Sequence, residues 1–110
     1  MNCSEQEIID AMNVEIKQLN YDRDLLRGSL DSLEEAYRGQ IRVAANQQRA
    51  GQAVGDEAAR EMAGLKSRMA KNARELAALD LREQKIREEF QAQLERYRAL
   101  LEKYSEENPG

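Results

Sequence analysis

The side chains that could carry acid–base chemistry in this chain are carboxylates, because its 110 residues include no histidine. Histidine is the most frequent general base of enzymes, since its imidazole titrates near neutral pH. Adjacent carboxylate pairs occur at Glu88-Glu89 and Glu106-Glu107. Neighbouring positions of a helix point in different directions, so neither pair can converge on one substrate. We therefore expect solubilising charge at both pairs, no catalytic residue, no small-molecule substrate and no enzyme activity.

Metal and phosphate chemistry also lack their usual residues. The single cysteine, Cys3, can form neither an intramolecular disulfide nor the thiol pair of a zinc site. We expect Cys3 to be a small residue near a frayed terminus, and a disulfide between two chains is the alternative. Gly51 and Gly55 are not followed by the Gly-Lys-Ser/Thr of a phosphate-binding loop. The sequence therefore predicts neither a metal site nor a cofactor.

Basic side chains gather in the middle of the chain and could bind an acidic partner or phosphate groups. Residues 38–74 contain eight basic and three acidic residues, a net charge of +5, whereas residues 1–37 carry −6 and residues 75–110 carry −3. The aromatic residue nearest to this basic segment is Tyr37 at its edge, so base stacking on nucleic acid is not favoured. A solvated helix face is the alternative interpretation of the basic residues Arg38, Arg42, Arg49, Arg60, Lys66, Arg68, Lys71 and Arg74.

The composition favours long helices over a globular core. Charged residues make up 35% of the chain, and its aromatic residues are one Phe and four Tyr, with no Trp. Such a chain can also be disordered, but its regular apolar spacing argues against disorder. No apolar run reaches the roughly 20 residues of a membrane span, and the N-terminus lacks the apolar stretch of a secretory signal. We expect a soluble, cytoplasmic, all-α protein.

Apolar residues recur at alternating steps of three and four in both halves of the chain, which indicates coiled-coil helices. A capping-box pattern beginning at Ser4 starts the first helix, which is expected at about residues 4–50. The second helix is expected at about residues 57–107, because the Asn-Pro-Gly sequence after it breaks helices. The predicted seam consists of Ile9, Met12, Ile16, Leu19, Leu26, Leu30, Leu33, Tyr37, Leu65, Met69, Leu76, Leu79, Ile86, Phe90, Tyr97 and Leu100.

The segment at about residues 51–56 separates the two helices. The heptad phases of the two halves disagree, and Gly51 and Gly55 each weaken a helix by about 1 kcal/mol relative to alanine. Asp56 is a favourable N-cap for a second helix. We therefore predict a turn and a long antiparallel helical hairpin, a two-helix coiled coil in a single domain over residues 1–110. The alternative is a continuous helix in a parallel dimer, with the phase change absorbed as a stutter.

Antiparallel packing lets the register be predicted, since a positions of one helix face d positions of the other. The favoured match pairs Leu33 with Leu76 and reverses the chain within residues 54–55. A shift of one heptad preserves the a–d matching as well. Arg23 and Glu83 fall in adjacent layers of the favoured register, where an ion pair between them would help to specify the alignment.

Apolar residues also lie beside the predicted seam, which suggests a further helix-packing surface. A two-helix core is narrow, so self-association into a dimer or a four-helix bundle would bury more apolar area. A wider seam within one hairpin is the alternative. A run of alanines also surrounds the turn. The candidate oligomer face consists of Ile8, Ile41, Val43, Leu94 and Leu101.

These features favour a structural or interaction protein. The first hypothesis is a coiled-coil scaffold, spacer or adaptor with an acidic open end and a basic turn end, whose partner is a protein, including a second copy of itself. The second is a binding arm whose basic tip grips an acidic protein surface or nucleic acid. In shape and charge richness the hairpin resembles the coiled-coil stalks beneath flagellar and type III secretion ATPases. A stalk or chaperone component of a secretion or phage assembly machine is therefore a third hypothesis, and no site residues follow from it.

Overall fold

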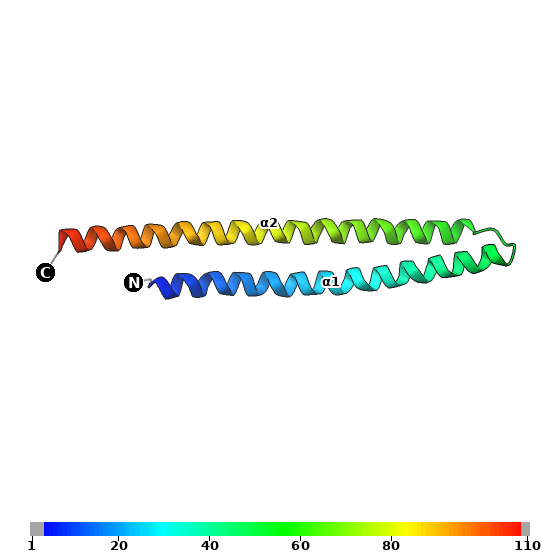
Figure 1. Cartoon of the computed structure of the whole chain (residues 1–110), viewed down its shortest axis with the longest axis horizontal. Coiled ribbons are helices and arrows are strands. Elements are labelled where there is room, and N and C mark those ends of the chain that lie inside the picture. The colour runs from blue at the N-terminus through cyan, green and yellow to red at the C-terminus, as the bar shows by residue number, and fades with distance from the viewer. Residues whose placement is uncertain (1–3, 109–110) are drawn as a thin grey trace. The chain divides into compact units, whose positions relative to one another are not determined.

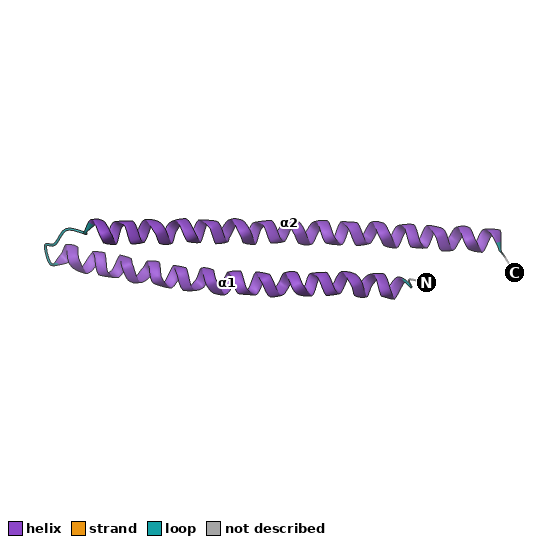
Figure 2. Cartoon of the chain, turned by 180° about the vertical axis from the view of Figure 1, so that it is seen from behind, coloured by secondary structure: helices purple, strands orange, loops and turns teal. Residues whose placement is uncertain are grey.

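The computed structural model describes residues 4–108, which form two α-helices joined by a short loop (Figures 1 and 2). Helix α1 spans Glu5–Arg49 and helix α2 spans Asp56–Glu107, and the described residues contain no β-strand. The two helices form a hairpin, which confirms the predicted all-α class. Cys3 and the Pro-Gly pair at the end of the chain lie outside the described residues, so the expectations for them stay predictions.

Ser4 caps the start of α1. The backbone N–H of Glu7 donates to the Ser4 hydroxyl oxygen at 3.1 Å, and the N–H of Ile8 donates to the Ser4 carbonyl at 3.2 Å. Glu5 and Glu7 add negative charge to the first turn, where the helix dipole favours it. The cap satisfies an amide group that has no acceptor within the helix.

A Schellman motif at Gly51 ends α1. The N–H of Gly51 donates to the carbonyl of Gln48 at 3.0 Å, and the N–H of Gln52 donates to the carbonyl of Gln47 at 2.8 Å. Gly51 has a φ of 76°, in the left-handed region that a residue with a Cβ adopts only at a cost. This glycine therefore both terminates α1 and reverses the direction of the chain.

Helix α2 begins one residue earlier than expected. The carbonyl of Gly55 accepts a hydrogen bond from the N–H of Ala59 at 3.1 Å, so Gly55 occupies the cap position and Asp56 is the first helical residue. The prediction of Asp56 as the N-cap is therefore wrong by one position. Asp56 and Glu57 lie in the first turn, where negative charge is still favourable.

The hairpin divides into two compact units, and both helices contribute to each unit. The first unit combines Met1–Tyr21 with Leu79–Gly110, and the second is the continuous segment Asp22–Ala78, which contains the turn. Within each unit the α1 segment and the α2 segment run in opposite directions (Figure 1). The expectation of a single domain stays a prediction.

The core of the first unit is small. Ile16, Leu19 and Ile86 form its buried cluster, and Ile86 is only 3% exposed. An ion pair between the Arg98 guanidinium and the Glu5 carboxylate joins the two segments outside this core. The hydrogen bond to Glu5, together with the attraction of its charge, raises the pKa of Arg98. The partly buried residues that pack against the cluster are Met12, Leu79 and Phe90.

Two side-chain hydrogen bonds join the helices of the second unit, in which Leu33 is buried. The Asn72 amide donates to the Ser29 hydroxyl at 3.1 Å, and the Gln40 amide donates to the Glu61 carboxylate at 3.4 Å. Gln40 lies eleven residues after Ser29, and Glu61 lies eleven residues before Asn72. Both bonds therefore specify the same antiparallel alignment.

This alignment differs from the favoured sequence-based register by about one heptad. The favoured register places Ser29 opposite Asp80, whereas the observed bond places Ser29 beside Asn72. The chain reverses at Gly51 rather than within residues 54–55, because Gly51 carries the left-handed conformation. A shift of one heptad still sets a positions against d positions, which is why both alignments fit the apolar pattern.

Leu100 was assigned to the seam, and this prediction is wrong. Its side chain is 67% exposed. Arg98 forms an ion pair with Glu5, which is the first residue of α1. The residues of α2 that follow Arg98 therefore lie beyond the start of α1. The shifted register therefore leaves Leu100 without a described partner in α1.

Leu94 was assigned to an oligomer face, and this prediction is also wrong. Its side chain is buried, with 8% exposure, whereas Gln93, three residues after the seam residue Phe90 and therefore the next position of the strict heptad spacing, is exposed. The buried positions step from Phe90 to Leu94, four residues instead of three. An α-helix has 3.6 residues per turn, so its buried stripe drifts against a strict heptad and moves to the next position.

Candidate interaction site beside the turn

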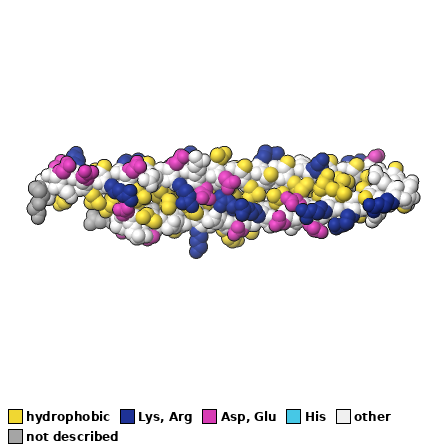
Figure 3. Space-filling model, viewed as in Figure 1, with side chains coloured by type: hydrophobic (Ala, Val, Ile, Leu, Met, Phe, Trp, Pro, Cys, Tyr) yellow, Lys and Arg dark blue, Asp and Glu magenta, His cyan; other side chains and the backbone are white. Residues whose placement is uncertain are grey.

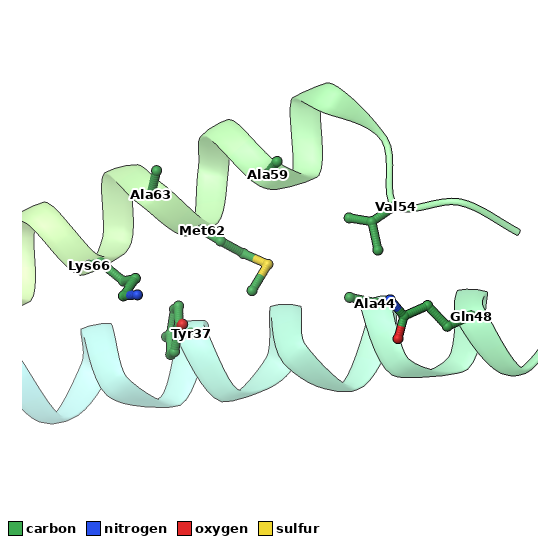
Figure 4. A pocket seen from close by; sticks show the side chains of 8 residues that line it. All are labelled: Tyr37, Ala44, Gln48, Val54, Ala59, Met62, Ala63 and Lys66. Carbon is green, nitrogen blue, oxygen red and sulfur yellow. The ribbon is translucent and has the colours of Figure 1, made fainter.

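A groove of about 440 Å³ lies between α1, the loop and the start of α2 in the second unit (Figure 4). Its lining is mainly apolar with a few polar groups, which is typical of sites that accept a partner's side chain. The lining residues are Tyr37, Ala44, Gln48, Val54, Ala59, Met62, Ala63 and Lys66.

Small side chains leave this groove open. Ala44, Ala59 and Ala63 stand where larger residues would fill the space beside the helices. Met62 extends from α2 toward α1, and the Val54 side chain points from the loop toward Ala44 (Figure 4). Met62 and Val54 are only half-buried, so part of their apolar surface stays in water. Covering that surface would favour binding of an apolar group.

Polar groups border the groove on both helices. Lys66 and Gln48 contribute them directly, and Tyr37 adds a phenol ring beside Lys66 (Figure 4). The neighbouring Gln47 has its side-chain carbonyl oxygen Oε1 buried without a hydrogen-bond partner. A buried acceptor without a donor costs free energy, so we expect the Gln47 side chain to weaken the end of α1.

The residues predicted to form a basic tip all lie in the second unit. Arg38 forms ion pairs with Glu34 at 3.5 Å and with Glu35 at 3.7 Å. Arg42 also pairs with Glu35, at 3.7 Å. These pairs lie within α1 and are well exposed, and such pairs contribute little to stability. Arg38 and Arg42 can therefore exchange these acids for those of a partner at small cost.

Five cations on α2 form no ion pair among residues 4–108. All five are exposed, and Figure 3 shows Lys and Arg side chains bordering hydrophobic ones over this part of the hairpin. Cations without acidic partners produce a positive potential that attracts acidic groups. The five residues are Arg60, Lys66, Arg68, Lys71 and Arg74.

Net charge separates the two units. The first unit has a net charge of −5 and the second of +1. Within the second unit, residues 38–74 carry +5. The groove therefore lies in the most basic part of an acidic protein.

The other sequence-based assignments fall into two groups. Every assigned seam residue of α1 is buried or half-buried, and so are those of α2 from Leu65 to Tyr97. Among the candidate oligomer residues, Ile8 is half-buried and Leu94 is buried within the hairpin, and a role of the remaining three in self-association stays a prediction. The members of that face that remain exposed are Ile41, Val43 and Leu101.

The Arg23–Glu83 pair also stays a prediction, because these two residues belong to different units. Glu83 accepts a hydrogen bond from the Arg87 guanidinium at 3.1 Å, one helical turn further along α2.

Within the described part of the chain, no group of three or more acidic, cysteine or histidine side chains could hold a metal ion. Neither described helix has a stretch apolar and long enough to cross a membrane. No protein-family model, curated protein or solved structure matches this chain. Function must therefore be inferred from the residues themselves.

The sequence pointed to the basic residues of this site but not to its groove. The alanine run around the turn was a usable signal, since small residues at helix-packing positions leave space. Val54 and Gln48 could not be assigned to the groove, because their positions depend on the path of the loop after Gly51.

Proposed function

We propose that this chain is a non-enzymatic interaction protein, a coiled-coil scaffold or adaptor, that binds an acidic protein segment beside its turn. The observation that carries the proposal is the apolar groove of the second unit next to cations that have no acidic partner. The proposed partner is an amphipathic helix with apolar residues on one face and Asp or Glu beside them. Lys66 has a central role, because it lines the groove and is one of the unpaired cations.

Two forces would act together in this complex. An apolar side chain of the partner would cover Met62 and the alanines, and full burial of one Leu-sized side chain contributes about 1.5–3 kcal/mol. The cations would attract the partner's carboxylates over a distance, which speeds association and weakens as salt is added. The apolar contact provides affinity at any salt concentration, and the charges provide preference for an acidic partner.

Nucleic acid would also be attracted by the cations, but the site offers little for bases. Tyr37 is half-buried at the groove, and residues 38–74 contain no aromatic residue. Stacking on aromatic rings is a main source of affinity for single-stranded nucleic acid. An apolar groove likewise adds nothing to phosphate binding. These two features favour the acidic protein segment.

Fluorescence anisotropy with three labelled model peptides tests the proposal. The first peptide has leucines at helical spacing flanked by glutamates, the second is a scramble of it, and the third has lysines in place of the glutamates. We expect the first peptide alone to bind, with a Kd that rises several-fold with salt. Equal binding of the scrambled peptide, or tighter binding of duplex or single-stranded nucleic acid at matched salt, would contradict the proposal.

Matched variants locate the binding site. Lys66→Glu is expected to raise the Kd of the first peptide about tenfold, since it reverses a charge at the groove. Met62→Ala should weaken binding at high salt as well as at low salt, because it removes apolar contact. Lys85→Glu makes the same charge change in the first unit and should alter the Kd much less. Equal effects of Lys66→Glu and Lys85→Glu would mean that binding follows net charge alone.

A further inference from the structure

Helix α1 carries apolar side chains on a face that α2 does not cover. Val14 is 70% exposed and Tyr21 is 61% exposed. Gln18 lies between them at steps of four and three, so the three residues share one side of the helix. With Lys17 they line a hollow on the surface of the first unit. Val14, Gln18 and Tyr21 are named the N-terminal patch.

A second patch on α1 lies in the second unit and has the same spacing in reverse order. Ala36, Gly39 and Val43 are separated by steps of three and four, and they are named the C-terminal patch. Ala36 is exposed and Val43 is 50% exposed. A Cβ at Gly39 would come within 4 Å only of the Arg42 guanidinium, at 3.8 Å. Gly39 is half-buried, and a side chain that approaches it would meet the flexible end of Arg42.

The two patches complement each other in size when they come from different copies of the chain. The N-terminal patch of one copy can pair antiparallel with the C-terminal patch of another copy. Two of the facing pairs then combine a large side chain with a small residue, and the third combines two valines. Such matching lets two helices approach without clashes or voids. The facing pairs are Val14 with Val43, Gln18 with Gly39, and Tyr21 with Ala36.

Acidic residues flank the N-terminal patch, and arginines that are ion-paired within α1 flank the C-terminal patch. Asp10 and Glu15 flank the N-terminal patch, with Lys17 as the one base among them. Arg38 and Arg42 flank the C-terminal patch, where they form ion pairs with Glu34 and Glu35 of the same helix. The pairing that aligns the apolar residues also places Glu15 opposite Arg42. Opposite charges at the rim of an interface select partner and orientation. The match of large with small residues and the Glu15–Arg42 match therefore favour the same antiparallel alignment.

We infer that α1 of this chain pairs antiparallel with α1 of a second copy. Each copy carries one patch of each kind, so the interface is self-complementary and contains the same contact twice, as two-fold dimers require. Parallel pairing would instead set acidic flank against acidic flank. This face does not use Leu94 or Leu101, and it is separate from the groove beside the turn. The inference does not depend on the proposed function.

Charge reversal tests the pairing by sedimentation equilibrium. Glu15→Arg and Arg42→Glu each place like charges at both contacts, so we expect each variant to raise the dimer dissociation constant about tenfold or more. Mixing the two variants should restore the wild-type constant, because an arginine then meets a glutamate at both contacts of the mixed dimer. Glu102→Arg, an exposed change on α2, should leave the constant unaltered. Circular dichroism verifies that all variants remain equally helical.

Disulfide trapping gives a second readout that does not depend on charge. In a Cys3→Ser background, a Val14→Cys chain mixed with a Val43→Cys chain should form a disulfide between them, since a disulfide needs close Cβ atoms. A Leu81→Cys chain, exposed on α2, should not crosslink to Val43→Cys. A wild-type chain that stays monomeric at about 0.5 mM overturns the inference. Charge variants that stay monomeric when mixed, or a faster disulfide between two Val14→Cys chains, overturn it as well.

Discussion

Asn72 on α2 donates a hydrogen bond to the hydroxyl of Ser29 on α1 at 3.1 Å and thereby joins the two helices of the second unit. Gln40 and Glu61 form a second bond in the same alignment. Polar pairs that join two helices beside the seam favour one register, because sliding by one heptad separates donor from acceptor. The sequence-based register, about one heptad away, matches a with d positions equally well. These two hydrogen bonds give a physical reason why the observed alignment is adopted instead.

The Ser29–Asn72 bond should appear as coupling in a double-mutant cycle. Ser29→Ala and Asn72→Ala are each expected to lower the free energy of unfolding by about 0.5–1 kcal/mol, the usual contribution of one hydrogen bond. The double variant should lose less than the sum of the two, by about 0.5 kcal/mol. Urea denaturation measures all three. A cycle of Ser29 with the exposed Ser67 is the control and should be additive.

Gly51→Ala should destabilise the hairpin by about 1 kcal/mol, because alanine must then adopt the left-handed conformation of the Schellman motif. Gly64→Ala should have the opposite sign and stabilise α2 by about 1 kcal/mol, since alanine is the better helix former. A Cβ would meet nothing within 4 Å at either position, so the difference reports backbone conformation alone. Thermal and urea denaturation measure both variants. A gain in stability for Gly51→Ala would show that the turn has another geometry.

Ile86→Ala should be far more destabilising than Leu100→Ala. Ile86 is the most buried side chain of the core in the first unit, and its truncation is expected to cost about 2–4 kcal/mol. Leu100 is exposed, so its truncation should change the free energy of unfolding by less than about 0.5 kcal/mol. A large loss for Leu100→Ala in chemical denaturation would instead support the sequence-based register, in which Leu100 packs against α1.

Gln47→Met should raise the free energy of unfolding by about 1 kcal/mol. The substitution keeps the length of the side chain and removes a buried carbonyl oxygen that lacks a donor. The backbone carbonyl of Gln47 still accepts its bond from Gln52, so the end of α1 is preserved. Gln48→Met, at the neighbouring exposed position, should bring no such gain. Lower stability of Gln47→Met would indicate that the side-chain amide makes an interaction that methionine cannot replace.

The helices and their ends could be predicted because the signals for them are local. Ser4 supplies a side-chain acceptor at the start of α1, and the glycines and Asp56 mark the turn within a few residues. The apolar spacing then assigns the buried side of each helix, from Ile16 and Leu33 on α1 to Ile86 on α2. Such signals depend on neighbouring residues only, so the sequence shows them without knowledge of the fold.

The register, the burial of Leu94 and the groove beside the turn could not be predicted in the same way. A heptad pattern is unchanged by a shift of seven residues, so apolar spacing alone leaves more than one alignment with equal matching. The drift of an α-helix against the heptad then decides that Leu94 rather than Gln93 is buried. The groove depends on where the loop brings Val54.

By itself, the amino-acid sequence determined two helical segments, most of the side of each that is buried, and the basic charge around the segment between them. It favoured a reversal in that segment over a continuous helix. Only the tertiary structure decided which residues of α1 meet which residues of α2, and therefore that Leu100 remains in water whereas Leu94 is buried. The reason is that repeating patterns are periodic, whereas the hydrogen bond from Asn72 to Ser29 and the left-handed Gly51 occur at single positions and remove the ambiguity.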